Sequence, residues 1–250
     1  MKPTIALVGA SYRQALPTRR TIALLLLQVA PATIYLLATS NRTEEFAYQG
    51  AIEIGMTTYF ALVLPVVAIV IGAGVLGNER RDLTLSFIAL RPIPRPMIAA
   101  GKLVAAAAAA FTINAVGAFV LGLAHVVRFG SANLIFGLLV GSLLATIAYA
   151  AIYVPVGFLT DRAVIIGMAY LLIVENGLVF LLPGLASLSP WRLGVAAFGG
   201  LVPEAAAYIT EGDAVGSLAI STPRAAITVL IYAAVSIAVT TFLLYKRDLA

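Results

Sequence analysis

The sequence predicts an all-α membrane protein with six transmembrane helices. Of its 250 residues, 62% are hydrophobic and only 11% are charged, whereas an average soluble domain has roughly 45–50% apolar and about 25% charged residues. Six apolar stretches also reach the length of about 20 residues that a helix needs to cross a bilayer. A protein in lipid can expose Leu, Val, Ile and Ala, whereas a soluble one must expose charges. We expect residues 1–250 to form a single transmembrane domain.

The six predicted spans follow one another along the whole chain. They are 21–40, 55–76, 98–123, 134–159, 164–182 and 225–244. Pro31, Pro65 and Pro155 lie within spans, and we expect kinks there because neighbouring helices can satisfy the backbone groups that a kink frees. Gly137 and Gly141 are spaced for close helix packing, which we interpret as packing within the chain and not as a dimer seam.

The Lys and Arg residues fall mainly into alternate connections between these spans. If the N-terminus is cytoplasmic, the segments on that side hold Lys2, Arg13, Arg19, Arg20, Arg80, Arg81, Arg91, Arg95, Lys102, Arg162, Lys246 and Arg247, and the opposite segments hold only Arg42, Arg128, Arg192 and Arg224. Cytoplasmic segments carry such an excess of positive charge. We therefore expect a multi-pass protein of the cytoplasmic (inner) membrane with both termini in the cytoplasm. We read the net charge of +5 as a topology signal and expect no nucleic-acid partner.

Two segments outside the spans are too apolar for solvated loops. Residues 1–20 alternate apolar and basic positions before Pro17, which predicts an interfacial helix that turns into the membrane. The connection 183–224 carries Trp191 and many aliphatic residues, interrupted by Gly199, Gly200 and Pro203. It predicts short helices that partly dip into the outer leaflet.

The cytoplasmic connection 77–97 between spans two and three has the pattern of a short amphipathic helix. Its beginning, Glu79 to Asp82, is charged, the following positions are mostly apolar, and Pro92 ends any helix. The charges form either a solvated face or a docking surface, and the residue pattern alone leaves both open.

This loop resembles the one after the second helix in permeases of ABC-2 type transporters. The matching residues are Glu79, Thr84-Leu85, Arg91-Pro92-Ile93, Arg95 and Gly101-Lys102, and the departure is Leu83, where many members have Gly. The interfacial helix, six spans, long last outside loop and short basic tail fit the same family. The resemblance implies that the loop forms a coupling helix that docks on a cytoplasmic ATPase. The residues implied in that interface are Glu79, Arg80, Arg81, Asp82, Thr84, Leu85, Phe87 and Ile88. On this basis Glu79→Arg is expected to uncouple transport while insertion stays intact.

The chain has no G-x-x-x-x-G-K-[ST] phosphate loop, so we expect ATP and Mg²⁺ to bind a separate ATPase subunit and no cofactor to bind here. The resemblance implies two ATPase subunits and a second copy of this chain or a related permease, surrounded by membrane lipids. We do not expect an enzyme, because His125 is the only histidine and no paired catalytic motif appears.

Glu175 is the acid nearest the middle of a predicted span. A charge at that depth costs about 2.5–3.5 kcal/mol on insertion scales and normally faces the bundle interior. Glu175, with its neighbour Asn176, is a candidate for the translocation path; the alternative is a hydrogen-bonded Glu that stabilises packing. Since i and i+1 do not share a helix face, a partner must come from another span. The candidates are Asn114, Thr146, Tyr149 and Tyr153.

Three functions remain open from the sequence. The first is the permease subunit of an ATP-driven exporter of unknown substrate. The second is an ATP-independent transporter in which Glu175 couples ions. The third is a non-transporting membrane component of an ATPase complex.

Overall fold

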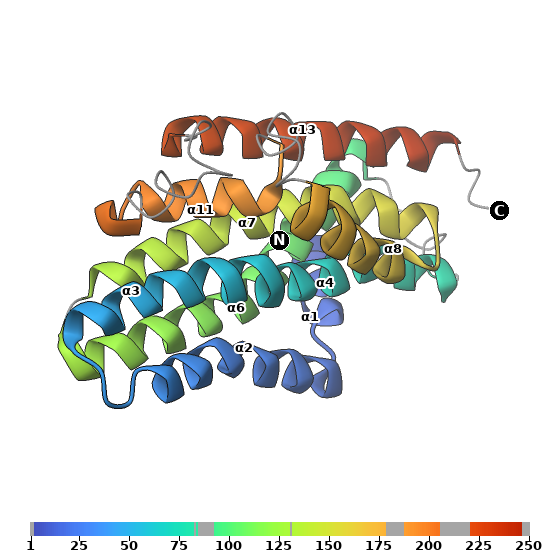
Figure 1. Ribbon diagram of the computed structural model, residues 1–250. Helices are drawn as coiled ribbons and strands as arrows, with labels where there is room; N and C mark the ends of the chain where they lie inside the picture. Colours follow the sequence, from blue (N-terminus) through green and yellow to red (C-terminus); the bar gives the residue numbers. More distant parts are fainter. Residues whose placement is uncertain are drawn as a thin grey trace.

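The computed structural model describes residues 3–82, 84, 93–130, 132–178, 188–205 and 221–246, and within them it contains helices and no β-strand (Figure 1). The chain order is α1 (Pro3–Ala15), α2 (Thr18–Ala38), α3 (Glu44–Ile54), η1 (Gly55–Val63), α4 (Leu64–Arg81), α6 (Arg95–Phe129), α7 (Asn133–Leu159), α8 (Ala163–Tyr170), η2 (Leu171–Leu178), α11 (Pro190–Gly199) and α13 (Thr222–Lys246). The segments η1 and η2 are π-helical. The all-α class is confirmed.

Five described helices are long and apolar enough to cross a membrane. They are Thr18–Ala38, Glu44–Arg81, Arg95–Phe129, Asn133–Leu159 and Thr222–Lys246, and each contains or overlaps one predicted span. The remaining predicted span, 164–182, corresponds to α8 and η2, whose apolar part is shorter. Its last residues lie outside the described ranges. The chain is thus a multi-pass membrane protein, and the count of six spans stays a prediction.

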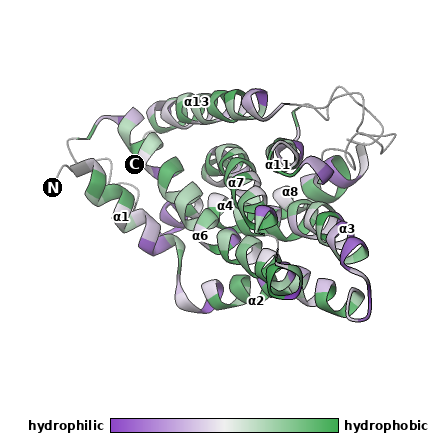
Figure 2. Cartoon of the chain, turned by 90° about the vertical axis from the view of Figure 1, so that its left-hand side faces the viewer, coloured by the Kyte–Doolittle hydropathy of each residue, from purple (hydrophilic) through white to green (hydrophobic). Residues whose placement is uncertain are grey.

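Helix α4 lies in the middle of the bundle, against α6 and α7 (Figure 2). Its close approach to α7 depends on glycine, because a Cβ at Gly77 would lie 2.9 Å from the carbonyl oxygen of Gly157. Gly157 in turn faces the α4 backbone at Ala73. Small residues at such crossings let membrane helices pack backbone against backbone. This crossing fixes the end of α4, where the candidate site lies.

Helices α2 and α13 lie at opposite edges of the bundle (Figure 2), and both expose apolar side chains. The exposed residues include Ile22, Leu26, Val29, Ile34 and Leu37 on α2 and Ile227, Leu230, Ile231, Val235 and Phe242 on α13. Contiguous apolar faces of this kind are rare on soluble monomers and normal on helices that face lipid.

The π-helical segment η1 joins α3 and α4 into one long helix. Its wider turn changes the side-chain register, so residues before and after it do not follow one 3.6-residue period. Within η1 the carbonyl of Met56 accepts a hydrogen bond of 3.1 Å from the indole N–H of Trp191. This contact attaches the beginning of α11 to the second predicted span.

At the N-terminus, the described residues 3–20 of the predicted interfacial segment form helix α1, a turn and the first residues of α2. Helix α1 ends at Ala15, and α2 begins at Thr18, directly after Pro17. The Arg20 guanidinium donates to the Ala15 carbonyl and closes this turn. Helix α1 packs against α6 and α4. A helix followed by a proline turn agrees with the prediction, and its place at the membrane interface stays a prediction.

Helix α11 lies in the described part of the predicted outside connection 183–224. It packs against α7 and α13, and Leu193 and Phe198 are fully buried. A Cβ at Gly141 of α7 would lie 2.7 Å from the carbonyl oxygen of Gly194. The Gly137–Gly141 spacing therefore packs within the chain, as predicted. The helix ends at Gly199, where the sequence predicted an interruption; residues 183–187 and 206–220 lie outside the described ranges.

Candidate functional site

The described basic residues gather mainly at one end of the bundle, which we call the basic end. It is formed by the α1–α2 turn, the end of α4, the beginning of α6 and the α7–α8 turn (Figure 1). It carries Arg13, Arg19, Arg20, Arg80, Arg81, Arg95, Lys102 and Arg162. The opposite end, at the α2–α3 connection, carries Arg42 and Arg128. The distribution agrees with the predicted inside segments, while the side of the membrane stays a prediction.

An ion pair between Glu79 and Lys102 lies inside the basic end. Glu79 is the third residue from the end of α4, and Lys102 lies in the second turn of α6. Lys102 is 0% exposed and Glu79 is 2% exposed. The Lys102 ammonium pairs with the Glu79 carboxylate and also donates a hydrogen bond of 2.8 Å to the Ser11 hydroxyl of α1. Three helices that meet at the predicted coupling loop are thus joined by one ammonium group.

The ion pair strongly constrains the position of α4 relative to α6 because both charged groups are shielded from water. Attraction between charges increases where the surroundings are less polar than water. Removal of one partner leaves an uncompensated charge, which typically costs 3–5 kcal/mol. The direct ATPase contact predicted for Glu79 stays a prediction, and the structure gives its carboxylate a partner within the chain.

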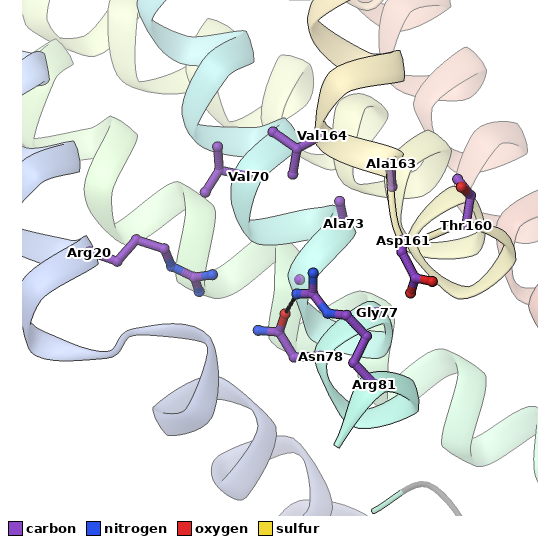
Figure 3. Close-up of a pocket in the computed structure, with 11 residues that line it drawn as sticks. Arg20, Val70, Ala73, Gly77, Asn78, Arg81, Thr160, Asp161, Ala163 and Val164 are labelled. Atoms are coloured by element: carbon purple, nitrogen blue, oxygen red, sulfur yellow. Dashed lines mark hydrogen bonds between the residues drawn. The ribbon is translucent and has the colours of Figure 1, made fainter. Parts of the chain in front are cut away.

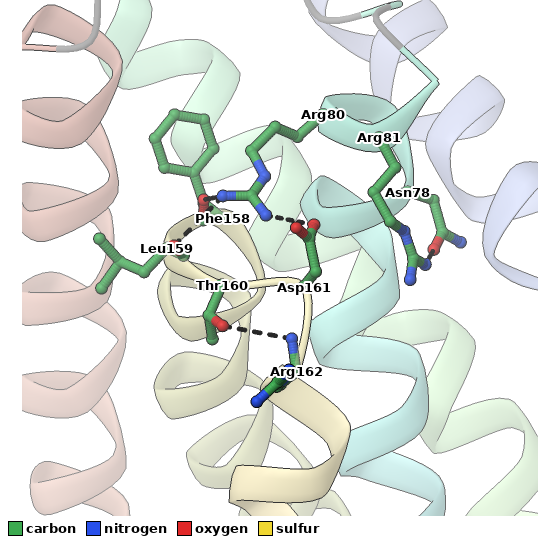
Figure 4. A network of polar contacts seen from close by, with 8 residues as sticks. All are labelled: Asn78, Arg80, Arg81, Phe158, Leu159, Thr160, Asp161 and Arg162. Carbon is green, nitrogen blue, oxygen red and sulfur yellow. Dashed lines mark hydrogen bonds and ion pairs between the residues drawn. The ribbon is translucent and has the colours of Figure 1, made fainter.

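Arg80 joins the end of α4 to the end of α7. Its guanidinium donates to the carbonyl oxygens of Phe158 and Leu159 at 3.1 and 3.2 Å and pairs with Asp161 (Figure 4). The last carbonyls of a helix lack intrahelical partners and carry partial negative charge, so a guanidinium is a suitable cap. Arg80 is therefore engaged within the chain like Glu79.

The remaining predicted interface residues differ in their placement. Arg81 and Asp82 are exposed, and Arg81 donates to the Asn78 amide oxygen (Figure 4). Thr84 bonds back to α4, its backbone N–H and hydroxyl lying 3.0 and 3.3 Å from the Glu79 carbonyl oxygen. Leu85, Phe87 and Ile88 lie outside the described residues. Among the described charged residues of the loop, Arg81 and Asp82 are the ones open to a partner protein.

Glu175 lies in η2 and faces the bundle interior, where it is 4% exposed. The Tyr149 hydroxyl of α7 donates to one carboxylate oxygen, and the Ser189 hydroxyl donates to the other at 2.8 Å. The Trp191 backbone N–H lies 3.5 Å from that second oxygen. The burial of Glu175 and its contact with Tyr149 confirm that this residue faces the interior and finds a partner on another span. Glu175 thereby joins η2, α7 and the beginning of α11.

Asn176 is not part of this cluster. Its side-chain amide donates to the Leu171 carbonyl at 2.8 Å, and the residue is exposed. Adjacent residues on a helix point in different directions, and the structure separates the two predicted path residues accordingly.

Residues 19–181, more than half of the chain, match the sequence model of a family described as ABC-2 family transporter protein. The chain belongs to the ABC-2 transporter family. The match runs from α2 to the sequence just after η2, so it includes Glu79, Lys102 and Glu175. A comparison with curated proteins gave no match. Membership in the ABC-2 family supports a permease role for this multi-pass protein.

This ABC-2 protein also contains a polar network that the sequence analysis missed. The Gln28 amide donates to the Asn114 side-chain oxygen at 2.6 Å, and the Asn114 amide donates to the Thr146 hydroxyl at 2.9 Å. The Tyr59 hydroxyl bonds the Asn114 carbonyl at 2.7 Å. All four side chains are fully buried.

Of the four candidate partners of Glu175, Tyr149 contacts it, whereas Asn114 and Thr146 belong to this other network. They bond each other because they occupy facing turns of α6 and α7, whereas Tyr149 lies almost one turn further along α7. The remaining candidate, Tyr153, stacks on Tyr149 with ring centroids 6.4 Å apart, and its buried hydroxyl has no hydrogen-bond partner among the described residues. A search for polar residues near the middle of several predicted spans would have found Gln28, Asn114 and Thr146 together.

Proposed function

We propose that the chain is the permease subunit of an ATP-driven exporter that is coupled at its basic end to a separate ATPase. The observation that carries this proposal is the Glu79–Lys102–Ser11 cluster. It fastens the helix before the predicted coupling loop to the helix after it and to α1. Family membership supplies the permease role.

The cluster gives a physical route from the loop to the bundle. A force on exposed Arg81 and Asp82 acts on the last turn of α4, which cannot shift alone because Glu79 is held by α6 and Arg80 by α7. Since α4 is packed against α7 through Gly77 and Gly157, displacement of its end moves neighbouring helices as a body. Packed elements with few alternative arrangements transmit such shifts.

The predicted interface residues of the loop then divide into two groups. Arg81 and Asp82, with Leu85, Phe87 and Ile88, contact the ATPase, whereas Glu79 and Arg80 hold the loop to the membrane domain. Exposed charges at an interface set orientation and association rate more than affinity. ATP and Mg²⁺ bind the partner, and the full transporter contains two ATPase subunits and two permease chains.

In this proposal, Glu175 stabilises the packing of η2 against α7 and α11. Two hydroxyl donors and a nearby backbone N–H surround its two oxygens, which favours a packing role over a freely exchanging ion site. This is also the observation against an ATP-independent transporter driven by Glu175. Asn176, which is exposed, is the better candidate of the two for contact with a transported molecule.

The test is reconstitution of the chain with its ATPase in proteoliposomes. The expected result is ATP hydrolysis that rises in the presence of the permease, together with vanadate-sensitive export of one compound from a panel of lipids, drugs and peptides. Export that continues without ATP would favour the ion-coupled alternative. ATPase binding without any export would favour the non-transporting component.

A further inference from the structure

A small cavity opens at the basic end between α2, the end of α4 and the α7–α8 turn (Figure 3). Its volume is about 80 Å³. The side chains that give it its chemistry are Arg20, Asn78, Arg81, Thr160, Asp161 and Val164. Pockets for drug-sized molecules measure roughly 300–1,000 Å³, so this cavity fits a single small group and not a typical transported compound.

The cavity has a surplus of positive charge. Arg20 reaches it from α2 and Arg81 from α4 (Figure 3). Asp161 also lines it, but its carboxylate pairs with Arg80. Among the described residues, no carboxylate pairs with Arg20 or Arg81. Two guanidinium groups therefore face the cavity, and neither is paired with a carboxylate of the described residues.

Both guanidinium groups are held in position before any ligand binds. Arg20 donates to the Ala15 carbonyl, and its Nε atom is buried with no hydrogen-bond partner among the described residues. The Arg20 guanidinium lies against Gly74, where a Cβ would be 3.1 Å from its Nη1 atom. Arg81 is held by the Asn78 amide oxygen. Such positioning reduces the entropy that binding must remove.

The ligand chemistry follows from the guanidinium groups and from the apolar residues beside them. The planar donor groups of arginine match the oxygens of a phosphate, and basic pockets between membrane helices bind lipid headgroups. Val164 on α8 lines the cavity and is 37% exposed, and exposed apolar residues follow closely in sequence at Ile22 on α2 and Ile165 on α8. These side chains can contact acyl chains, whereas a free phosphate ion has no apolar part for them to contact.

We propose that this cavity binds the phosphate group of an anionic phospholipid from the leaflet at the basic end. The bound headgroup joins the beginning of α2 to the end of α4, two elements that flank the coupling site. Anionic lipid then stabilises the basic end in the arrangement that the structure shows.

Native mass spectrometry of the purified chain in detergent tests the proposal without the ATPase. Phosphatidylglycerol, phosphatidylcholine and inorganic phosphate are titrated separately. We expect retention of one phosphatidylglycerol at about tenfold lower concentration than phosphatidylcholine. Arg20→Gln should weaken phosphatidylglycerol binding about tenfold, which is about 1.4 kcal/mol for one lost charged hydrogen-bond donor, and Arg20→Lys should restore part of it. The matched control is Arg19→Gln, which removes the same charge from an exposed neighbour that does not line the cavity.

A second variant keeps the test informative if Arg20→Gln folds poorly. Asp161→Asn removes the carboxylate among the described residues that line the cavity and frees Arg80, so phosphatidylglycerol should bind more tightly. The proposal is overturned if phosphatidylcholine binds as well as phosphatidylglycerol, if Arg19→Gln weakens binding as much as Arg20→Gln, or if Asp161→Asn weakens it. Equal saturation of the cavity by inorganic phosphate would identify a free anion as the ligand and overturn the assignment to lipid.

Discussion

Lys102 pairs with Glu79 across the two ends of the predicted coupling loop, and the same ammonium group donates a hydrogen bond of 2.8 Å to Ser11 of the N-terminal helix. Both charged residues belong to the loop pattern from which the family was predicted. The structure gives that pattern a physical meaning: the Glu before the loop and the Lys after it neutralise each other inside the protein.

The first prediction concerns this pair. Lys102→Met should lower the free energy of unfolding by about 3–5 kcal/mol because it leaves the Glu79 carboxylate buried without a counter-charge. The double variant Glu79→Met with Lys102→Met should lose less than Lys102→Met alone. Chemical unfolding in detergent measures both. Equal losses in the single and double variants would mean that the pairing contributes little.

The pair also changes what we expect of Glu79→Arg. An arginine at this position would lie beside Lys102, with two like charges in a buried site. We therefore expect little folded protein, and not the uncoupled but correctly inserted transporter that the sequence suggested. Recovery of folded Glu79→Arg at the wild-type yield, measured by size-exclusion chromatography, would contradict this expectation.

The second prediction concerns the exposed charges of the loop. Reversal of both, as Arg81→Glu with Asp82→Arg, should abolish stimulation of the ATPase while changing the free energy of unfolding by no more than about 0.5 kcal/mol. Arg42→Glu, an exposed reversal at the opposite end of the bundle, serves as the control. The ATP hydrolysis rate in proteoliposomes is the measurement. Full stimulation in the double variant would remove both residues from the interface.

The third prediction separates charge from packing at Glu175. Glu175→Gln keeps acceptor and donor atoms near Tyr149 and Ser189, so assembly and transport should remain close to wild type. Glu175→Ala leaves buried donors without an acceptor and should lower stability by about 1–3 kcal/mol. Thermal unfolding and export assays follow the two variants. A loss of export in Glu175→Gln with normal stability would instead place this charge in the translocation path.

The fourth prediction tests the crossing of α4 and α7. Gly157→Ala inserts a Cβ against the α4 backbone at Ala73 and should destabilise the protein by about 1–3 kcal/mol. Gly9→Ala is the matched control, because a Cβ there meets nothing within 4 Å. Ala is also the better helix former, so Gly9→Ala should leave stability unchanged or raise it by up to about 1 kcal/mol. If both variants unfolded at the same temperature, the close crossing would not matter for stability.

The helices could be predicted from the sequence more completely than the contacts between them. The five long helices followed from apolar length, and burial of Glu175 followed from the cost of a charge in lipid. The partners of Asn114 and Thr146 were not predictable in the same way, because they depend on the rotation of α6 against α7. The π-helices add to this difficulty, since a wider turn in η1 or η2 changes which side chains face the interior.

The pairing of Glu79 with Lys102 was missed for a different reason. A charged residue at the end of a predicted span is normally read as facing water, and the positive-inside rule counts Lys102 as a loop residue. Helix α6 begins at Arg95 and brings Lys102 inside against α1 and α4. Only the packing of these three helices shows that the two charges neutralise each other and leave Arg81 and Asp82 as the exposed ones.

We propose that the end of α4 faces the cytoplasm and receives an ATPase. The chain has no native cysteine, so Asp82→Cys can be labelled with a membrane-impermeant maleimide as the only thiol. We predict labelling in inside-out vesicles, none in sealed cells, and protection when the ATPase subunit is bound. Labelling of sealed cells, or labelling in vesicles that the bound ATPase leaves unchanged, would contradict the account.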